Sequence, residues 1–268
     1  MNKNITLIAI ILAICTSFAS CINVTNTVKR GCGNIVTSER TVSAFQEINI
    51  SSNATVRFHA SDEFRVVITT DENLHEYIEI ETRGNTLYIG NRGRSDSSSR
   101  RNVGLSVGGD VIIGHSVTIS NGIRFTQLAI DVFAPTLSGV TVSGLGRFET
   151  VETLSVPSFT AIVSGSGRIT SAIESDRFSA TVSGSGRITA VGSSRDANVS
   201  IAGSGRFIGS EFVTNTTTAN VTGSGNAAIH VTERMNASVA GSGRITYRGN
   251  PPQANRNVSG SGSVRRAD

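Results

Sequence analysis

Residues 178–190 read FSATVSGSGRITA, and the side chains of this stretch alternate with a period of two. Small or apolar residues occupy every even position, and Ser, Thr or Arg occupies every odd one. Such alternation is typical of a β-strand with one buried face. The parity continues through Gly184 and Gly186. We therefore expect both glycines to face inward at a tight bend, where no room exists for a Cβ.

The same motif recurs along the chain. Gly-X-Gly appears seven times between Gly144 and Gly262, and its second glycines lie 21, 19, 19, 20, 18 and 19 residues apart. A period near 19 indicates one supersecondary unit repeated along an axis. Helical repeats would need good helix formers, and a propeller blade needs about 40 residues. The predicted fold is an all-β, single-stranded parallel β-helix with coils of about 19 residues. Its structural corner consists of Gly165, Gly167, Gly184, Gly186, Gly203, Gly205, Gly223, Gly225, Gly241 and Gly243.

The N-terminus is typical of a secretion signal. Lys3 precedes an apolar run from Ile5 to Cys15 that is too short to span a bilayer. Residues 1–20 are the predicted signal peptide. Phe18-Ala19-Ser20-Cys21 is similar to a bacterial lipobox, which favours lipidation of Cys21. The alternative is cleavage after Ala19, which leaves Cys21 free to pair with Cys32.

The rest of the chain divides into three predicted regions. A polar tether covers residues 21–37, and an N-terminal β region covers residues 38–125, with a loop at 91–102. Regular β-helix repeats cover residues 126–266. In the N-terminal region we expect strands at residues 47–50, 54–59, 64–70, 77–80, 86–89, 103–107, 111–113 and 117–119, and then at 128–133.

The order of these pieces resembles the GIN-domain family of secreted bacterial proteins and lipoproteins, described as autotransporter adhesin heads. The resemblance rests on residues 39–50, 66–68, 71–74 and 86–89, followed by the serial Val-Ser-Gly-Ser-Gly. It covers about residues 33–266 and implies a right-handed β-helix, no established catalytic residues and a role in adhesion. One departure is that Arg follows most of the Gly-Ser-Gly motifs, where the family often has Asp or Asn.

Positive charge follows the repeats. The net charge is +4, and all of the excess lies in residues 147–268. Stacked coils place the residues after the glycines in one outward file, whose arginines are Arg147, Arg168, Arg187, Arg206 and Arg244. Two guanidinium groups about 4.8 Å apart repel by roughly 0.8 kcal/mol in water. The file is either a solvated face or a ridge that binds phosphate, carboxylate or sulfate groups of a polymer.

Catalysis has little support in the sequence. The acidic residues of the repeats form no consistent file, and the four histidines lack metal-ligand spacing. We therefore expect no catalytic residue, no metal and no cofactor. An enzyme that cleaves polysaccharides remains the alternative, with its catalytic cluster on a loop such as 91–102.

The sequence thus predicts a non-catalytic binding module of adhesion type in the cell envelope. An anionic polysaccharide or another envelope component is the expected partner, and nucleic acid is not, because no aromatic platform accompanies the charge. The expected location is the bacterial outer membrane or cell surface, through the lipid anchor, with a free periplasmic protein as the alternative. Self-association is open, and a purely structural envelope component is the third alternative.

Overall fold

The computed structural model describes residues 29–91 and 123–267. The described residues from Arg30 onward belong to one compact unit built almost wholly of strands. Its first part contains β1 (Lys29–Arg30), β2 (Ile35–Thr41), β3 (Glu47–Ile50), β4 (Thr55–Ala60), β5 (Arg65–Asp71), the 3-10 helix η1 (Glu72–Tyr77), β6 (Ile78–Arg83), β7 (Thr86–Asn91), β8 (Ile123–Arg124) and β9 (Leu128–Ala134). Its second part contains β10 (Gly139–Gly144), β11 (Arg147–Thr150), β12 (Leu154–Gly165), β13 (Arg168–Gly184), β14 (Arg187–Gly203), β15 (Arg206–Gly223), β16 (Asn226–Gly241), β17 (Arg244–Arg248), β18 (Gln253–Ser259) and β19 (Ser263–Arg266).

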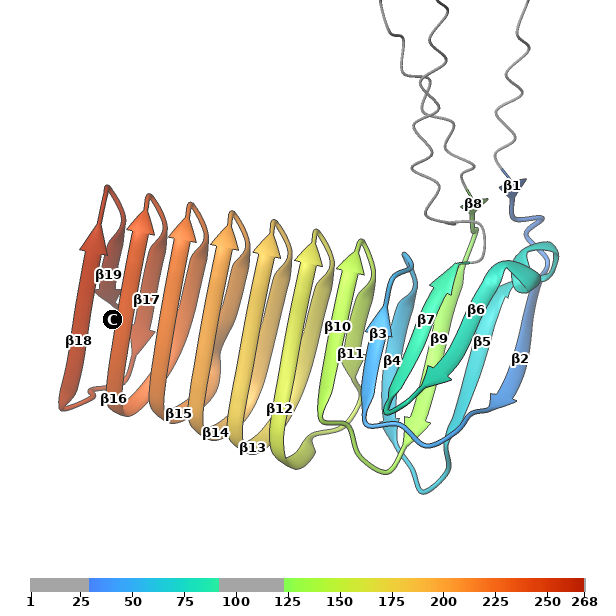
Figure 1. Ribbon diagram of the computed structural model, residues 1–268, viewed down its shortest axis with the longest axis horizontal. Coiled ribbons are helices and arrows are strands. Elements are labelled where there is room, and N and C mark those ends of the chain that lie inside the picture. Colours follow the sequence, from blue (N-terminus) through green and yellow to red (C-terminus); the bar gives the residue numbers. More distant parts are fainter. Residues whose placement is uncertain (1–28, 92–122, 268) are drawn as a thin grey trace, which may run out of the picture. The chain divides into compact units, whose positions relative to one another are not determined.

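The second part is a β-solenoid, as the sequence predicted (Figure 1). Each coil has one segment that leads into the Gly-X-Gly turn, such as residues 177–184, and one that leaves it, such as residues 187–193. The segments that lead in form sheet A, and those that leave form sheet B. The two sheets are joined at the glycine turn and at the opposite bend. In Figure 1 the sheet A strands run upward at the front and each later coil lies further left, so the coils wind in a right-handed sense.

Because the parallel pairing keeps a constant register, equivalent residues of successive coils stack on one another. Between β13 and β14 the register is 19 residues throughout, from Arg168–Arg187 to Gly184–Gly203. Inward positions therefore form continuous apolar files, which explains why a chain with few aromatic residues can fill its core. Phe178 packs between Phe159 and Phe212, with ring centroids 6.3 Å and 4.6 Å away.

The N-terminal end of the solenoid is closed by antiparallel strands. Strands β3 and β4 form a coil that pairs in parallel with β10 and β11, and on its other side with β7 and β9. Beyond these, β6 pairs antiparallel with β7, and β5 pairs antiparallel with β9 and β2. The antiparallel strands end the parallel stack. The first parallel strands of the solenoid therefore do not form an unpaired edge of the sheet at this end.

Asp71, the last residue of β5, fastens this end. Its buried carboxylate accepts hydrogen bonds from the backbone N–H groups of Gly33, at 2.9 Å, and Thr126, at 2.7 Å. Burial acts to raise the pKa of Asp71, but these bonds hold it below its ordinary value. The carboxylate therefore joins two segments that lie far apart in the sequence.

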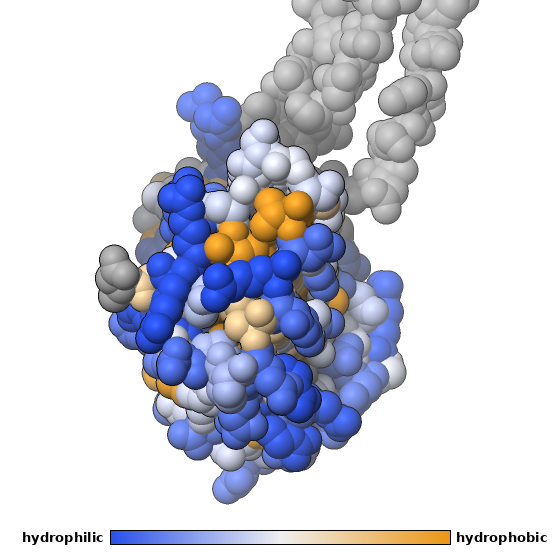
Figure 2. Space-filling model, turned by 90° about the vertical axis from the view of Figure 1, so that its left-hand side faces the viewer, coloured by the Kyte–Doolittle hydropathy of each residue, from blue (hydrophilic) through white to orange (hydrophobic). Residues whose placement is uncertain are grey.

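The C-terminal end is closed differently. In β18, Arg256 occupies the inward position that Ala237 holds in the preceding coil, and its guanidinium lies over the Tyr247 ring and bonds the Tyr247 hydroxyl. Figure 2 shows this end as mostly hydrophilic, with a few apolar side chains near its centre. An inward charge on an edge strand discourages the pairing of further strands.

Most predicted strands of the first part match observed ones within two or three residues, from β3 to β7 and at β9. β2 begins at Ile35, inside the range predicted as a polar tether. The predicted signal peptide, Cys21, the loop at 91–102 beyond Asn91, and the strands at 103–107, 111–113 and 117–119 lie outside the described residues.

Candidate functional site

The first glycine of each turn has a backbone conformation that other residues rarely adopt. Gly184 has φ 113°, and the first glycines of the other turns have φ values from 102° to 117°. This position is not on the buried face that the alternation predicted: Gly165 and Gly203 are exposed, and Gly184 is half-buried. A Cβ on Gly184 would point toward the preceding coil and lie 2.8 Å from the Gly165 carbonyl oxygen there. Glycine is therefore required by φ and by the close approach of the coils.

The second glycine is required by the core. Gly186 is buried, and a Cβ there would lie 2.3 Å from Val163 Cγ1 and 2.8 Å from the carbonyl oxygen of Gly167. Gly205, Gly225 and Gly243 meet the same two obstacles from their own preceding coils. The two glycines of one motif thus serve different physical purposes.

Backbone hydrogen bonds lock each turn onto the one before it. The N–H of Ser185 donates to the carbonyl of Gly165 at 2.9 Å, and the N–H of Arg187 donates to the carbonyl of Gly167 at 3.0 Å. The same pair of bonds recurs in the neighbouring coils. Because the residue after the turn takes part in this pattern, its side chain leaves each coil at the same place.

The structure consequently brings the five predicted arginines into one file, which we call the arginine ridge: Arg147, Arg168, Arg187, Arg206 and Arg244. Consecutive members Arg147, Arg168, Arg187 and Arg206 are direct register partners. Asn226 interrupts the ridge before Arg244, and Ser263 follows it. Four of the arginines are exposed, and Arg187 is half-buried.

No ridge arginine forms an ion pair with a described residue. The Nε atom of Arg187 is buried and has no hydrogen-bond partner among the described residues. Arg168, Arg187 and Arg206 border a hollow of about 130 Å³ together with Ser166, Ser185 and Ser204. These serine side chains form no hydrogen bond with the described part of the chain, so the hollow offers free hydroxyl and guanidinium donors.

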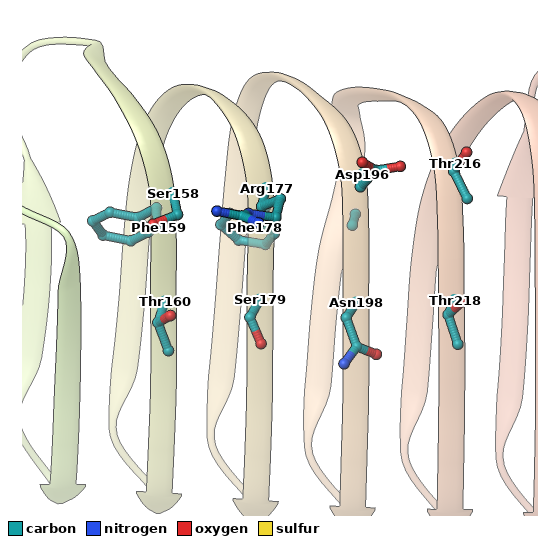
Figure 3. A pocket seen from close by; sticks show the side chains of 11 residues that line it. Ser158, Phe159, Thr160, Arg177, Phe178, Ser179, Asp196, Asn198, Thr216 and Thr218 are labelled. Atoms are coloured by element: carbon teal, nitrogen blue, oxygen red, sulfur yellow. The ribbon is translucent and has the colours of Figure 1, made fainter.

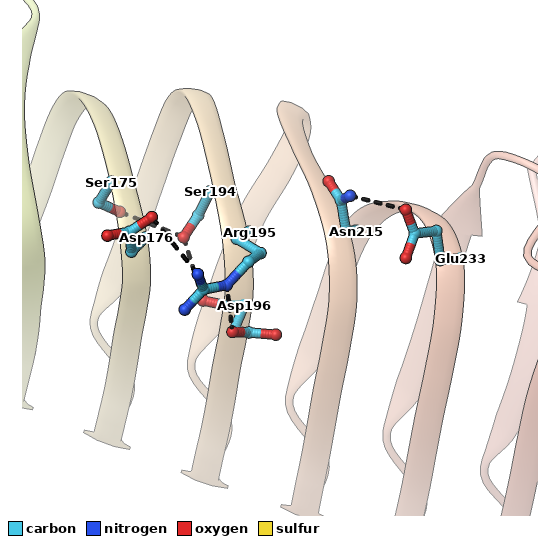
Figure 4. Close-up of polar contacts among 7 residues, drawn as sticks. All are labelled: Ser175, Asp176, Ser194, Arg195, Asp196, Asn215 and Glu233. Atoms are coloured by element: carbon cyan, nitrogen blue, oxygen red, sulfur yellow. Dashed lines mark hydrogen bonds and ion pairs between the residues drawn. The ribbon is translucent and has the colours of Figure 1, made fainter.

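At the opposite bend, unlike on the ridge, an arginine is paired with carboxylates (Figure 4). Arg195 lies between two carboxylates, with Nε 3.0 Å from Asp196 Oδ2 and Nη1 3.7 Å from Asp176 Oδ1. The hydrogen bond with Asp196 and the charge of Asp176 raise the pKa of Arg195. In the next coils, Asn215 donates to Glu233 at 2.7 Å. At this bend the charge of Arg195 is therefore neutralised by carboxylates, and the Glu233 carboxylate accepts a hydrogen bond from an amide.

One cluster that the sequence did not reveal lies on β4 and β9. Asp131 accepts hydrogen bonds from Arg57 at 2.7 Å and from His59 at 2.8 Å. Burial acts to raise the pKa of Asp131, but the bonds with His59 and Arg57 lower it overall. His59 also stacks on Phe133, at 4.6 Å between ring centroids. The partners are 72 and 74 residues apart in sequence, so only their places on adjacent strands reveal the cluster.

Among residues 29–91 and 123–267, His, Cys, Asp and Glu side chains form no group of three or more that could hold a metal ion. Over the same residues, no helix combines the length and apolar character needed to cross a membrane. Cys32 is exposed and free among them.

Comparison with known families identifies the chain. Residues 44–251 match the family described as "Putative auto-transporter adhesin, head GIN domain", and the chain belongs to that family. The predicted resemblance is therefore confirmed. A search of curated proteins found no match.

Solved structures share the fold. A "putative adhesin" from Bacteroides fragilis is 20% identical, with a TM-score of 0.72 over 89% of this chain and 99% of its own. A "Putative lipid binding protein" from Parabacteroides distasonis is 23% identical, with a TM-score of 0.70 over 90% and 100%. A "putative adhesin" from Parabacteroides merdae is 21% identical, with a TM-score of 0.65 over 89% and 98%. At these identities the likeness establishes the fold.

Proposed function

We propose that this protein is a non-catalytic, adhesion-type module of the bacterial cell envelope that binds an anionic polymer through the arginine ridge. The observation that carries the proposal is that the ridge arginines stack in register on successive coils and have no carboxylate partner among the described residues. Arg57, Arg83 and Arg195 each pair with a carboxylate, whereas no arginine of the ridge does so within the described residues. Membership of a family described as adhesin heads supports the adhesive role.

The energetics favour a repeating ligand. Adjacent coils lie about 4.8 Å apart, so neighbouring guanidinium groups repel each other, and salt screens that repulsion only in part. A small anion relieves it at one or two arginines. A polymer that carries an anionic group at a similar spacing neutralises Arg168, Arg187 and Arg206 together, without further loss of translational freedom for each contact.

Phosphate, carboxylate and sulfate groups all suit the planar fork of arginine. Such groups occur on acidic polysaccharides and on the headgroups of anionic lipids, and one structural neighbour is named as a lipid-binding protein. The proposal specifies the anionic polysaccharide, and the lipid arm of the experiment below separates the two sources.

The test compares a triple variant of the ridge with a matched control. Arg168→Ser, Arg187→Ser and Arg206→Ser together remove three ridge charges; Ser already occupies the equivalent position 263. The control removes three arginines elsewhere on the solenoid, at Arg195, Arg234 and Arg248, and so changes the net charge equally. Binding to polygalacturonate, to heparin and to phosphatidylglycerol vesicles is measured at two salt concentrations.

We expect the ridge variant to lose at least tenfold in affinity for the polysaccharides and the control to lose much less. Affinity of the parent should also fall with salt, because the contacts are exposed. Equal losses of affinity in both triple variants would show that the ridge acts only through the overall positive charge of the protein. Preference for the vesicles would assign it to lipid, and absence of binding in every arm would leave a structural envelope component.

We further propose that Cys21 carries the lipid that anchors the protein at the outer membrane or cell surface. The lipobox-like Phe18-Ala19-Ser20-Cys21 supports this. Mass spectrometry of the mature N-terminus should find a lipidated Cys21, and Cys21→Ser should release the protein from membranes or leave it unprocessed. An unmodified chain that begins at Ser20, with Cys21 bonded to Cys32, would contradict the anchor.

A further inference from the structure

The outward face of sheet A differs in chemistry from the ridge. Three outward files run along it from β12 to β18, and no position in them is charged. Nearly every position carries a hydroxyl or an amide. Among these three, the file nearest the opposite bend is Thr160, Ser179, Asn198, Thr218, Asn236 and Asn255. These three files can donate and accept hydrogen bonds but carry no charge. The charged outward positions of sheet A, Arg177, Asp196 and Arg234, lie in a fourth file at the opposite bend.

A groove of about 630 Å³ crosses this face over four successive coils (Figure 3). Thr160, Ser179, Asn198 and Thr218 project from neighbouring strands along it. Next to them, at the end of the strands near the bend, lie Ser158, Arg177, Asp196 and Thr216. The volume is within the usual range of ligand sites, and the open form suits part of a long chain.

The groove side chains have unused hydrogen-bonding capacity. Thr160, Ser179, Asn198 and Thr218 form no side-chain hydrogen bond with any residue in the described ranges. Further along the same file, outside the groove, Asn255 donates to Asn236 at 2.9 Å. The file can thus satisfy itself where amides are adjacent, and it leaves free donors and acceptors inside the groove.

Arg177 and Asp196 add directional groups. They are register partners on β13 and β14, and Arg177 forms no ion pair with the described residues. The Arg177 guanidinium can donate two parallel hydrogen bonds, which matches the vicinal hydroxyl groups of a sugar ring. Asp196 Oδ2 is bonded to Arg195, and its other oxygen is left to accept a hydrogen bond from a sugar hydroxyl. Arg195 pairs with Asp196 and with Asp176, so the two arginines and the two carboxylates at this end of the groove carry no net charge together.

We propose that this groove binds an uncharged polysaccharide chain that lies across the strands, along the solenoid axis, with successive sugar units on successive coils. The coil spacing of about 4.8 Å is close to the length of one pyranose unit in an extended glycan. Phe159 and Phe178, the aromatic residues of the lining, are buried, so no exposed ring offers a stacking platform. Each sugar is held weakly by hydrogen bonds, and affinity accumulates over several coils. This site is separate from the ridge and does not depend on the function proposed for it.

The experiment uses the mature protein and three uncharged hexasaccharides: cellohexaose, mannohexaose and isomaltohexaose. The groove variant combines Thr160→Val, Ser179→Ala, Asn198→Ala and Thr218→Val, which removes polar groups. Val favours strands, and Ala already occupies outward positions 202 and 240 of the same face. The control variant combines Ser164→Ala, Ser183→Ala and Thr222→Val. These residues belong to the file nearest the glycine turn, outside the groove. Isothermal titration measures affinity, and thermal unfolding checks that both variants fold.

We expect at least one hexasaccharide to bind, with an affinity that 0.5 M salt leaves unchanged within about twofold, because the site lacks net charge. The groove variant should weaken binding at least tenfold, and the control and the ridge triple variant should each stay within about threefold of the parent. No binding to any of the three sugars would overturn the proposal. So would unchanged binding by a folded groove variant, or a loss in the ridge variant that equals the loss in the groove variant.

Discussion

The two corners of each coil both reverse the chain, but they do so under different constraints. At the glycine turn the coils from Gly165 to Gly243 repeat the same backbone bonds, and the first glycine of every turn has a positive φ. At the opposite bend the sequences differ from coil to coil, and polar side chains such as Ser175, Arg195 and Asn215 bond locally (Figure 4). One corner is built by the backbone, and the other by side chains.

This difference explains where the solenoid absorbs variation in length. Arg187 and Arg206 remain in register at the glycine turn, although the next coil has an extra residue. The pairing instead shifts between Thr189 and Val191, on the way to the opposite bend, and the next pair of coils shifts between Ile208 and Val213. A corner that cannot vary keeps the outward side chains aligned, and this alignment makes a continuous ridge possible.

The largest effect should come from filling the rigid corner. We expect Gly186→Val to lower the free energy of unfolding by about 3 kcal/mol or more, at the upper end for overpacking. The reason is that one of the two obstacles to its side chain is the backbone carbonyl of Gly167, which is fixed by its bond to Arg187. Denaturant unfolding measures the loss.

A control for this prediction lies one residue away. Ser185 is exposed at the tip of the same turn, so Ser185→Ala should change stability by less than about 0.5 kcal/mol. If Gly186→Val unfolds at the same denaturant concentration as the parent, the second glycine is not required by packing and the contrast between the corners fails.

An intermediate effect should come from the buried hydroxyl pair near the opposite bend. Thr214 Oγ1 bonds Thr217 Oγ1 and donates to the His230 carbonyl at 2.8 Å. Thr214→Val removes the partner of the Thr217 hydroxyl and one hydrogen bond to the His230 carbonyl, and should cost about 1–3 kcal/mol. Thr217→Val should cost less, since Thr214 keeps its bond to His230. Denaturant unfolding of both variants measures the order, and the reverse order would show that Thr214 does not organise this bend.

The smallest effects should differ in sign between the corners. Arg195→Ser removes a cation from between two carboxylates and should lower the melting temperature slightly, by less than Thr214→Val does. Arg187→Ser removes repulsion within the ridge and should leave the melting temperature equal or raise it slightly. Both shifts should shrink as salt rises. Destabilisation by Arg187→Ser at low salt would indicate a partner that compensates the ridge charge.

Part of the candidate site could be predicted from the sequence because its members follow the repeat. Arg168, Arg187 and Arg206 occupy equal places in consecutive units, so parallel stacking alone aligns them. The groove has the same periodicity, but its residues resemble the solvent-facing side of any polar strand. Its hollow form depends on how neighbouring strands and their side chains lie in space. The Asp131–His59 contact has no periodic signal at all.

The repeat of the sequence determined the solenoid, its coil length and the file of arginines, because a period of two within a period of 19 permits few other ways to bury the apolar residues. Only the tertiary structure decided why each glycine of the motif is required. The alternation of apolar and polar residues in the sequence does not give the backbone dihedral angles or the distances to the preceding coil. It also decided which charges are paired. Arg195 pairs with Asp176 and Asp196 because the bend brings these side chains close together. At the glycine turn, no described carboxylate pairs with a ridge arginine.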